Sequence, residues 1–453
     1  MDRCNFGVAA MPEAVLSRPP AALLWRSSFL VASFPAQIMS SSAAGGTRPA
    51  SLLAPLKNAT YRRLWSATLL SNFGVWIQSV AAAWLMTSIA PTVDFVAWVQ
   101  AATALPPLCF TVLGGVLADR FDQRLVFLTA QVIVLSVAIL LSALDHAGVM
   151  TPWLLLALTF ALDSGSSLRY PAYQTTIGEL LPREQLQSAL VLASIGWNIA
   201  RALGPGLGGL IIAVAGVPAA FAANALCNVY IIGVLLSWYW KAPLSKPKAD
   251  EQSLLSQLIA GFAHVHATAT IRATMLRCFV FTGFASALWS LLPLVAKRMP
   301  GGGASTYGLM LGGLGVGALI GASMIGWMRH NWGLRRLFAA ATFALALTVL
   351  ALALVPSIYV LLPVLALGGF GWMVALSTFN VVVQLAAAES FRGRAISVYY
   401  IALFGGLALG SWAWGHVAVG AGVDWGLYGA TAGLLASLLL YRPSANSAFP
   451  DHL

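Results

Sequence analysis

The chain has 453 residues, of which 59% are hydrophobic and 9% charged, and its mean hydropathy is +0.82. A soluble domain cannot cover its surface with so few charged residues, so the composition indicates an all-α integral membrane protein. The formal net charge is +11, but the basic residues stand singly or in pairs between apolar runs. This scatter argues against a nucleic-acid-binding surface.

Residues 1–55 differ from the rest of the chain, because they are rich in Ser, Ala, Pro and Arg and contain one short apolar piece interrupted by Arg26. That piece is too short for a membrane span. We expect a disordered tail or a start codon assigned too early, since Met39 would begin a compact chain just before the first span. A signal or transit segment is the alternative.

Apolar runs long enough to cross a bilayer as a helix, roughly 17–25 residues, follow from Leu64 onwards. Twelve such runs are predicted, at residues 64–90, 94–118, 125–145, 151–178, 186–215, 218–240, 273–296, 305–328, 335–356, 358–386, 394–418 and 423–441. The longest connection, 242–271, divides them six and six. Its apolar residues between Leu254 and Val265 recur at helical spacing, which predicts an amphipathic helix on the inner membrane surface.

The two sets of six runs resemble each other. The spacing from Gly115 to Arg124 recurs 211 positions later from Gly326 to Arg335. A duplicated unit predicts two pseudo-symmetric six-helix bundles, at 56–241 and 272–442, followed by a C-terminal tail at 443–453.

The distribution of basic residues predicts the orientation. Lys297 and Arg298 are the only Lys or Arg residues in one set of connections. The opposite set holds fourteen: Arg120, Arg124, Arg183, Lys241, Lys246, Lys248, Arg272, Arg277, Arg329, Arg335, Arg336, Arg392, Arg394 and Arg442. Because cytoplasmic loops carry the excess of Lys and Arg, we expect both termini in the cytoplasm and a multi-pass protein of the bacterial inner membrane.

The turn between the second and third runs, GGVLADRFDQR, concentrates charge in an apolar region. It resembles the signature loop of the major facilitator superfamily at Gly115, Asp119, Arg120 and Arg124. Together with RRLWSATLLSNFGVWIQSVAAAWLM and PAYQTTIGELLPREQLQSALVLASIGWNIARALGPGLGG, it is similar to the branch that includes a bacterial enterobactin exporter and the transmembrane secretion effectors. The resemblance covers roughly residues 55–441.

The resemblance implies a twelve-helix secondary active transporter that works by alternating access. It also implies that the loop latches the two halves together on the cytoplasmic side. Asp119 would then meet Arg392 and Arg394 at the start of the eleventh run, where the helix N-terminus adds partial positive charge. The alternative is that these residues are ordinary interfacial charges that only set the topology.

The fifth run contains ARALGPGLGG, with Gly204, Pro205, Gly208 and Gly209. Pro205 predicts a helix bend and the glycines predict close helix approach. The segment resembles part of the antiporter motif of the superfamily, which favours proton-coupled export. A bent packing face without any bearing on the direction of transport is the alternative.

Charged residues inside the fourth and fifth runs are costly in a membrane and typical of functional sites. Asp163 is eighteen residues and Arg201 twenty residues from Leu181, so a rise of about 1.5 Å per residue places them at nearly the same depth. We predict that they face each other as an ion pair or a water-bridged pair. Asp163 is the candidate for proton binding, and Arg201 either adjusts its proton affinity or receives an anionic substrate group. A static pair that fixes helix register is the alternative.

The resemblance also implies that the first helix of each three-helix repeat lines a central cavity. The candidates on these helices are Asn72, Trp76, Arg169, Tyr170, Tyr173, Trp289, Trp372 and Asn380. Aromatic rings with a few amides suit an amphipathic small-molecule substrate such as a siderophore, drug or metabolite. Membrane-interface anchoring or packing is the alternative for the aromatic residues.

No phosphate-binding loop, HExxH motif or Ser/His/Asp arrangement is present in the sequence. We therefore expect neither an ATPase nor another enzyme, and neither a cofactor nor a metal. The expected partners are membrane lipid, a small-molecule substrate and protons, and the expected state is a monomer. Uptake of a small solute and a transport-inactive partner or sensor stay open as alternative functions.

Overall fold

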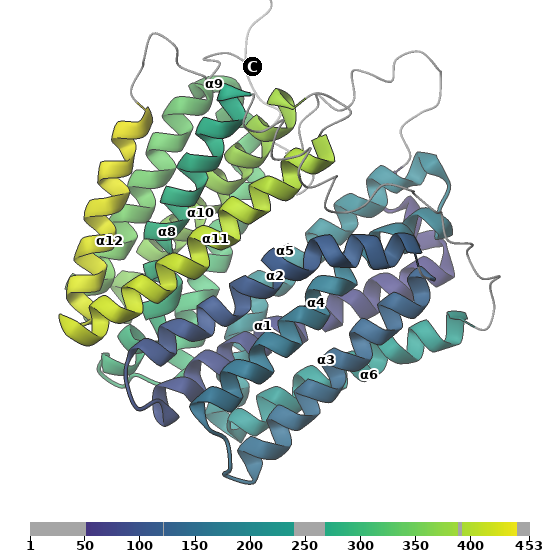
Figure 1. Cartoon of the computed structure of the whole chain (residues 1–453), viewed down its shortest axis with the longest axis horizontal. Helices are drawn as coiled ribbons and strands as arrows, with labels where there is room; N and C mark the ends of the chain where they lie inside the picture. Colours follow the sequence, from purple (N-terminus) through teal and green to yellow (C-terminus); the bar gives the residue numbers. More distant parts are fainter. Residues whose placement is uncertain (1–50, 121, 240–267, 388–391, 442–453) are drawn as a thin grey trace, which may run out of the picture.

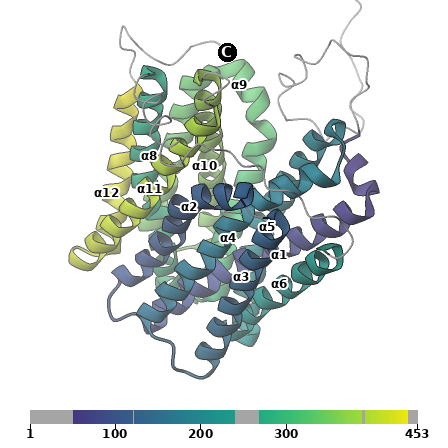
Figure 2. The same cartoon turned by 45° about the vertical axis from the view of Figure 1, so that its right-hand side comes forward.

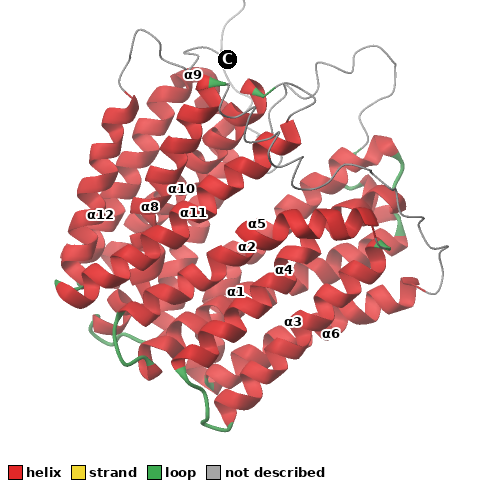
Figure 3. Cartoon of the chain, in the orientation of Figure 1, coloured by secondary structure: helices red, strands yellow, loops and turns green. Residues whose placement is uncertain are grey.

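The computed structural model describes residues 51–120, 122–239, 268–387 and 392–441. Within these ranges the chain folds into α-helices and two short 3-10 helices, Ala54–Lys57 and Leu438–Tyr441, without any strand (Figure 3). Nine of the described helices are long and apolar enough to cross a membrane. The predicted all-helical membrane fold is thereby confirmed.

The helices are arranged in two groups, which we call the first and second groups (Figure 1). The first group consists of α1 (Ala59–Ile89), α2 (Asp94–Arg120), α3 (Gln123–His146), α4 (Pro152–Leu180), α5 (Arg183–Ala215) and α6 (Val217–Tyr239). The second group consists of α8 (Ala269–Arg298), α9 (Ala304–Leu354), α10 (Ile358–Ala386), α11 (Arg392–Gly420) and α12 (Val423–Ser437). The predicted amphipathic helix and the two predicted tails, apart from residues 51–55, lie outside the described residues.

Helix α9 contains two of the predicted spans in one element of 51 residues. Its backbone leaves helical geometry at Gly333, where φ is +72°, a value that glycine adopts without steric penalty. On either side of this break, Gly321 packs against Phe370 and Gly371 packs against Ala341, so both arms of α9 lie along the same stretch of α10. The chain therefore reverses direction at Gly333, and the expected connection between the two spans is reduced to a sharp kink.

The two groups meet along two helix pairs, α2 with α11 and α5 with the first arm of α9 (Figures 1 and 2). A Cβ atom at Gly209 would lie 2.6 Å from the Ala304 carbonyl oxygen, and one at Gly308 would lie 2.7 Å from the Pro205 carbonyl oxygen. The backbones of α5 and α9 are in direct contact because neither glycine has a side chain. Helix α5 is unbroken through Pro205.

Further contacts between the groups lie near the ends of α1, α2, α8 and α11. Lys297 donates a hydrogen bond to the Thr87 carbonyl oxygen, and the rings of Trp84 and Tyr307 stack with centroids 6.5 Å apart. The rings of Trp98 and His416 stack at 6.2 Å. Toward the opposite end, where α6 ends and α8 begins, the ribbons of the two groups diverge (Figure 2). The groups are thus closed against each other at the end that carries the α1–α2 and α8–α9 connections.

We predict that Gly209→Ala destabilises the closed contact, because the new methyl group would overlap the backbone of α9. Overpacking of this kind costs about 1–3 kcal/mol. The matched control is Gly206→Ala on the same helix, where a Cβ atom would meet no atom within 4 Å. The control should be neutral or slightly stabilising, because alanine favours a helix over glycine. Thermal unfolding of the purified proteins in detergent measures the difference, and equal midpoints would contradict the packing assignment.

Candidate functional site

Three charged residues of the described helices lie more than ten positions from a helix end and from the kink at Gly333: Asp163 and Arg169 on α4 and Arg201 on α5. Charged groups at this depth are retained in membrane proteins when they face the protein interior or water. These three residues are therefore the starting point for the site.

The described residues do not form the predicted direct ion pair between Asp163 and Arg201. Helix α4 packs mainly on α2 and α3, whereas α5 packs on α1 and α9. Among the described residues the ion pairs are Arg124–Glu179 and Arg298–Asp424, and neither Asp163 nor Arg201 takes part in one. The prediction assumed that helices adjacent in sequence are also adjacent in space, which does not hold for α4 and α5.

Arg201 nevertheless points toward the boundary between the two groups. Neighbouring positions of α5 define its sides: Ala202 and Gly209 contact α9, while Gly204 and Gly208 contact α1. At 100° per residue, position 201 falls between these two sides. Arg201 is half-buried, and the described residues offer it neither a hydrogen bond nor an ion pair.

The contacts of its neighbours on α4 show which side of the helix Asp163 occupies. Gly165, about 200° further around the helix, packs against Val134 of α3, so Asp163 points away from α3. The ring of Phe160 meets Phe110 of α2 with centroids 6.1 Å apart. Position 163 therefore falls between the sides of α4 that contact α1 and α2, where its half-buried carboxylate has no hydrogen-bond or ion-pair partner among the described residues.

Arg169 is 8% exposed and lies between α4 and α1. Its guanidinium donates to the Ser71 hydroxyl at 2.7 Å and to the Asn72 side-chain oxygen at 3.4 Å. The structure therefore brings together two predicted cavity residues, Asn72 and Arg169, but as a buried contact. Both partners of the guanidinium are neutral, and no carboxylate of the described residues lies within ion-pair distance.

A network of buried side chains extends from Ser71 through the first group. Ser71 and Gln131 both donate to the Asn228 side-chain oxygen, at 3.3 and 3.1 Å. Asn228 donates to Asn224 at 2.9 Å, and Asn224 donates to Gln78 at 3.4 Å. The network joins α1, α3, α4 and α6. The sequence analysis missed it, although amides one turn apart in an apolar run, as at 224 and 228, are a recognisable signal.

The predicted aromatic candidates have different surroundings. Trp76 contacts Trp197 of α5 with ring centroids 5.8 Å apart, and its indole N–H is buried without an acceptor among the described residues. Tyr173 packs on Phe127. The side chain of Tyr170 lies outside the described part.

In the second group, Trp372 is buried and stacks on Phe281, with ring centroids 6.0 Å apart. Its surroundings are those of a core residue, so packing explains it without a substrate. Trp289 contacts Trp372 edge-on at 5.6 Å and is half-buried. Asn380 accepts a hydrogen bond from Gln384 of the same helix.

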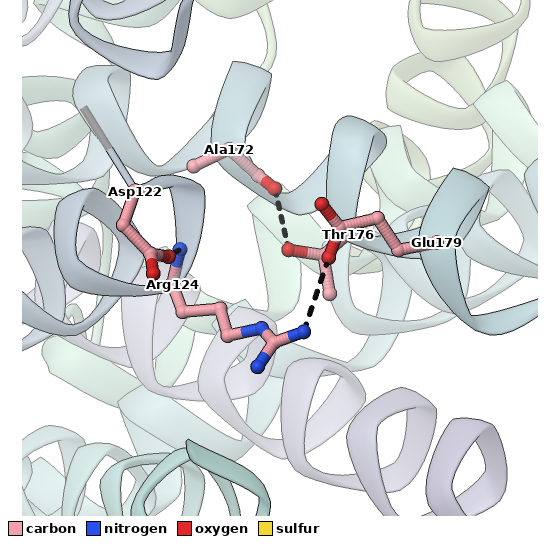
Figure 4. A network of polar contacts seen from close by, with 5 residues as sticks. All are labelled: Asp122, Arg124, Ala172, Thr176 and Glu179. Atoms are coloured by element: carbon pink, nitrogen blue, oxygen red, sulfur yellow. Dashed lines mark hydrogen bonds and ion pairs between the residues drawn. The ribbon is translucent and has the colours of Figure 1, made fainter. Parts of the chain in front are cut away.

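The predicted latch is described only in part. Arg124 forms an ion pair with Glu179 at 3.4 Å, which joins the beginning of α3 to the end of α4 (Figure 4). Asp122 caps α3 by accepting a hydrogen bond from the Arg124 backbone N–H at 2.8 Å. Nothing can be said of the other latch side chains, because those of Asp119, Arg120, Arg392 and Arg394, like the surroundings of Gly115, lie outside the described part.

We predict that Asn228→Ala and Asn228→Leu both destabilise the protein, because Ser71 and Gln131 lose their acceptor. A buried group left without its partner costs about 1–3 kcal/mol. The leucine variant nearly preserves the side-chain volume, so it separates this cost from that of a cavity. The control is Asn198→Ala, whose amide bonds only to the Ser194 carbonyl oxygen of its own helix. Unfolding midpoints in detergent measure the effect. A leucine variant as stable as the control would show that the network does not stabilise the protein.

The two groups of membrane helices form a fold that solved membrane transporters share. A bacterial homologue of the human lysosomal transporter Spinster, in an inward-facing and unoccupied conformation, is 12% identical with a TM-score of 0.67; 85% of this chain and 96% of that chain are covered. A mutant of the peptide transporter POT is 13% identical with a TM-score of 0.69, covering 90% and 98%. At these identities the likeness concerns the fold alone.

The chain belongs to the transmembrane secretion effector family of the major facilitator superfamily, whose profile matches residues 50–449. It is 23% identical to the staphyloferrin A transporter of Staphylococcus aureus, with 74% of this chain and 83% of that protein covered. It is 26% identical to the multidrug efflux pump Tap of Mycolicibacterium fortuitum, covering 73% and 82%. The enterobactin exporter EntS of Escherichia coli is 27% identical, covering 62% and 67%. The family predicted from the sequence motifs is confirmed.

Proposed function

We propose that the protein is a proton-coupled exporter of a small amphipathic molecule, such as a siderophore, a drug or another metabolite. The observation that carries the proposal is the position of Asp163 and Arg201, two half-buried charges without described partners at the boundary of two helix groups. The relatives support export, because those reported above include an efflux pump and a siderophore exporter. Uptake of a small solute and a transport-inactive partner are the alternatives.

In this proposal the chain crosses the bacterial inner membrane twelve times in two six-helix bundles, with α9 supplying two spans. Both termini are cytoplasmic, and the closed end of the boundary faces the periplasm. The protein functions as a monomer. The described contacts then correspond to an inward-facing state, because the groups touch at the periplasmic end and diverge at the cytoplasmic end.

During alternating access, the periplasmic end would open and the latch would close the cytoplasmic end. Asp119 would meet Arg392 and Arg394 when the cytoplasmic end closes, and the periplasmic contacts of Lys297 and Trp98 would separate. Arg124 and Glu179 stabilise the base of this latch, since they fix α3 against the end of α4 in the open state. The close packing of Gly204 and Gly208 would keep α5 against α1 during the motion, whereas the contact of Gly209 with α9 would open with the closed end.

We predict that Asp163→Asn abolishes proton coupling, because the amide cannot take up and release a proton as the boundary opens to either side. The transported compound is found first by comparing metabolites and drug susceptibility between deletion and overexpression strains. Flux of that compound is then measured in proteoliposomes with and without an imposed pH gradient. The gradient should accelerate transport by the wild type and should have no effect on the variant.

The matched control for this experiment is Asp145→Asn, which removes a carboxylate at the end of α3, away from the boundary. It should keep the response to the gradient. If transport by Asp163→Asn still responded to the pH gradient as in the wild type, Asp163 would not be the residue that couples transport to protons. A deletion strain that accumulates less of the compound than the wild type would favour uptake over export.

The proposed orientation predicts that a cysteine at an exposed position between α1 and α2 reacts with a membrane-impermeant thiol reagent applied from the periplasmic side. Thr92→Cys places it there. Arg183→Cys, at the beginning of α5, should be protected until the membrane is permeabilised. Both are made in a chain whose native cysteines are replaced by serine. The reverse pattern of labelling would invert the topology and with it the assignment of the closed end.

A further inference from the structure

The described membrane helices carry an uncompensated positive charge in their central parts. Arg169 and Arg201 supply two guanidinium groups there, and Asp163 supplies the one carboxylate. None of the three forms an ion pair with another described residue. A fixed positive charge in a medium of low dielectric constant attracts an anion much more strongly than it would in water. This excess of positive charge therefore favours a negatively charged ligand at the boundary.

The two arginines differ in whether their guanidinium groups have hydrogen-bond acceptors. Arg169 is buried, and its guanidinium donates to Ser71 and Asn72. Ser71 in turn donates to Asn228 of α6, which also accepts from Gln131 of α3. Arg201 is half-buried, and its guanidinium has no described acceptor. Arg169 thus adds positive potential from a fixed position, whereas Arg201 is available for direct contact with a ligand.

Aromatic side chains lie next to Arg201. Trp197 is one turn before it on α5 and contacts Trp76 of α1, with ring centroids 5.8 Å apart. Gly204, one turn after Arg201, lies against Trp76, because a Cβ atom there would come within 2.7 Å of the Trp76 Cβ atom. The Trp76 indole N–H is buried, and no described residue accepts a hydrogen bond from it. The neighbourhood of Arg201 therefore combines apolar rings with hydrogen-bond donors that lack acceptors.

We propose that the transported solute is an organic anion, a carboxylate or comparable acidic group on an aromatic or apolar body. Its acidic group contacts Arg201, and its apolar body packs on Trp76 and Trp197. A guanidinium matches a carboxylate with two parallel hydrogen bonds, and an indole ring offers a large apolar surface together with a donor. This inference rests on the proposed transport function and names the substrate class of the same site. An anion also suits export, because a membrane potential that is negative inside drives negative charge outward.

Three probes with the same ring system and different charge test the substrate class: 2-naphthoate, 2-naphthamide and 2-naphthylmethylammonium. Their binding to the purified full-length protein in detergent is measured by isothermal titration calorimetry. We expect 2-naphthoate to bind most tightly and the cation most weakly. Arg201→Gln should weaken 2-naphthoate binding about tenfold or more, the loss of one charge-assisted contact, while leaving 2-naphthamide binding within about twofold. Arg201→Lys should retain most of the affinity for the anion.

The matched control is Arg183→Gln, the same substitution at the exposed beginning of α5. It should bind all three probes as the wild type does. Thermal unfolding midpoints show whether the variants are folded, and Arg201→Lys keeps the test valid if the glutamine variant does not fold. Equal affinity for the three probes, a preference for the cation, or no binding of 2-naphthoate would overturn the proposal. The flux assay decides separately whether the protein transports, so failure of the substrate class is distinguishable from failure of the transport function.

Discussion

The arrangement of the molecule depends on the direct contact between the backbones of α5 and the first arm of α9. Gly209 and Gly308 face each other there, and Gly315 lies against Ala202 two turns further toward the middle of the helices. Lipid tails are as apolar as the side chains that they touch, so the hydrophobic effect contributes little to helix association in a membrane. Close packing of small residues provides the attraction instead. The same contact carries Arg201 to the boundary between the groups, because its position on α5 follows from which residues meet α9 and which meet α1.

The polar interior of the first group is organised around Arg169. A buried cation without a carboxylate is costly, and the structure offsets this cost with neutral acceptors. Arg169 donates to Ser71, Ser71 donates to Asn228, and Asn228 donates to Asn224. All three bonds run in the same direction, because each residue that accepts one bond donates the next. Chains of this kind strengthen through mutual polarisation in a medium of low dielectric constant. Together with the bond from Gln131, they link α1, α3, α4 and α6. The second group is centred instead on aromatic rings around Phe281.

The sequence alone predicts the helices well, because a membrane span requires a long apolar run. The tenth run, 358–386, coincides with α10, and most other runs agree with their helices within a few residues. The break at Gly333 is sharper than expected, because a kink at one glycine replaces a loop. The family resemblance was recovered from a few charged and glycine-rich motifs.

The candidate site was predictable in part. Asp163, Arg169 and Arg201 are conspicuous in sequence, since charges in apolar runs are rare. Their partners were not predictable, because spacing along the chain gives depth and helix face but not which helices are neighbours. Asp163 and Arg201 share a depth and lie on helices consecutive in sequence, yet those helices have different neighbours. The role of Asn228 was not predictable either, since it depends on two other helices, α1 and α3, which place Ser71 and Gln131 against one amide.

The two adjacent basic residues at the end of α8 have unequal roles in any opening of the closed end. Arg298 forms its ion pair with Asp424 and a hydrogen bond to the Leu352 carbonyl oxygen, both within the second group, so these bonds can survive a separation of the groups. Lys297 alone reaches across, to a carbonyl oxygen in the last turn of α1 that water could hydrate equally well. The polar part of this closure is therefore worth about 1 kcal/mol, the usual net value of one hydrogen bond. The resistance of the closed end to opening therefore comes mainly from the packing of α5 on α9 and of α2 on α11.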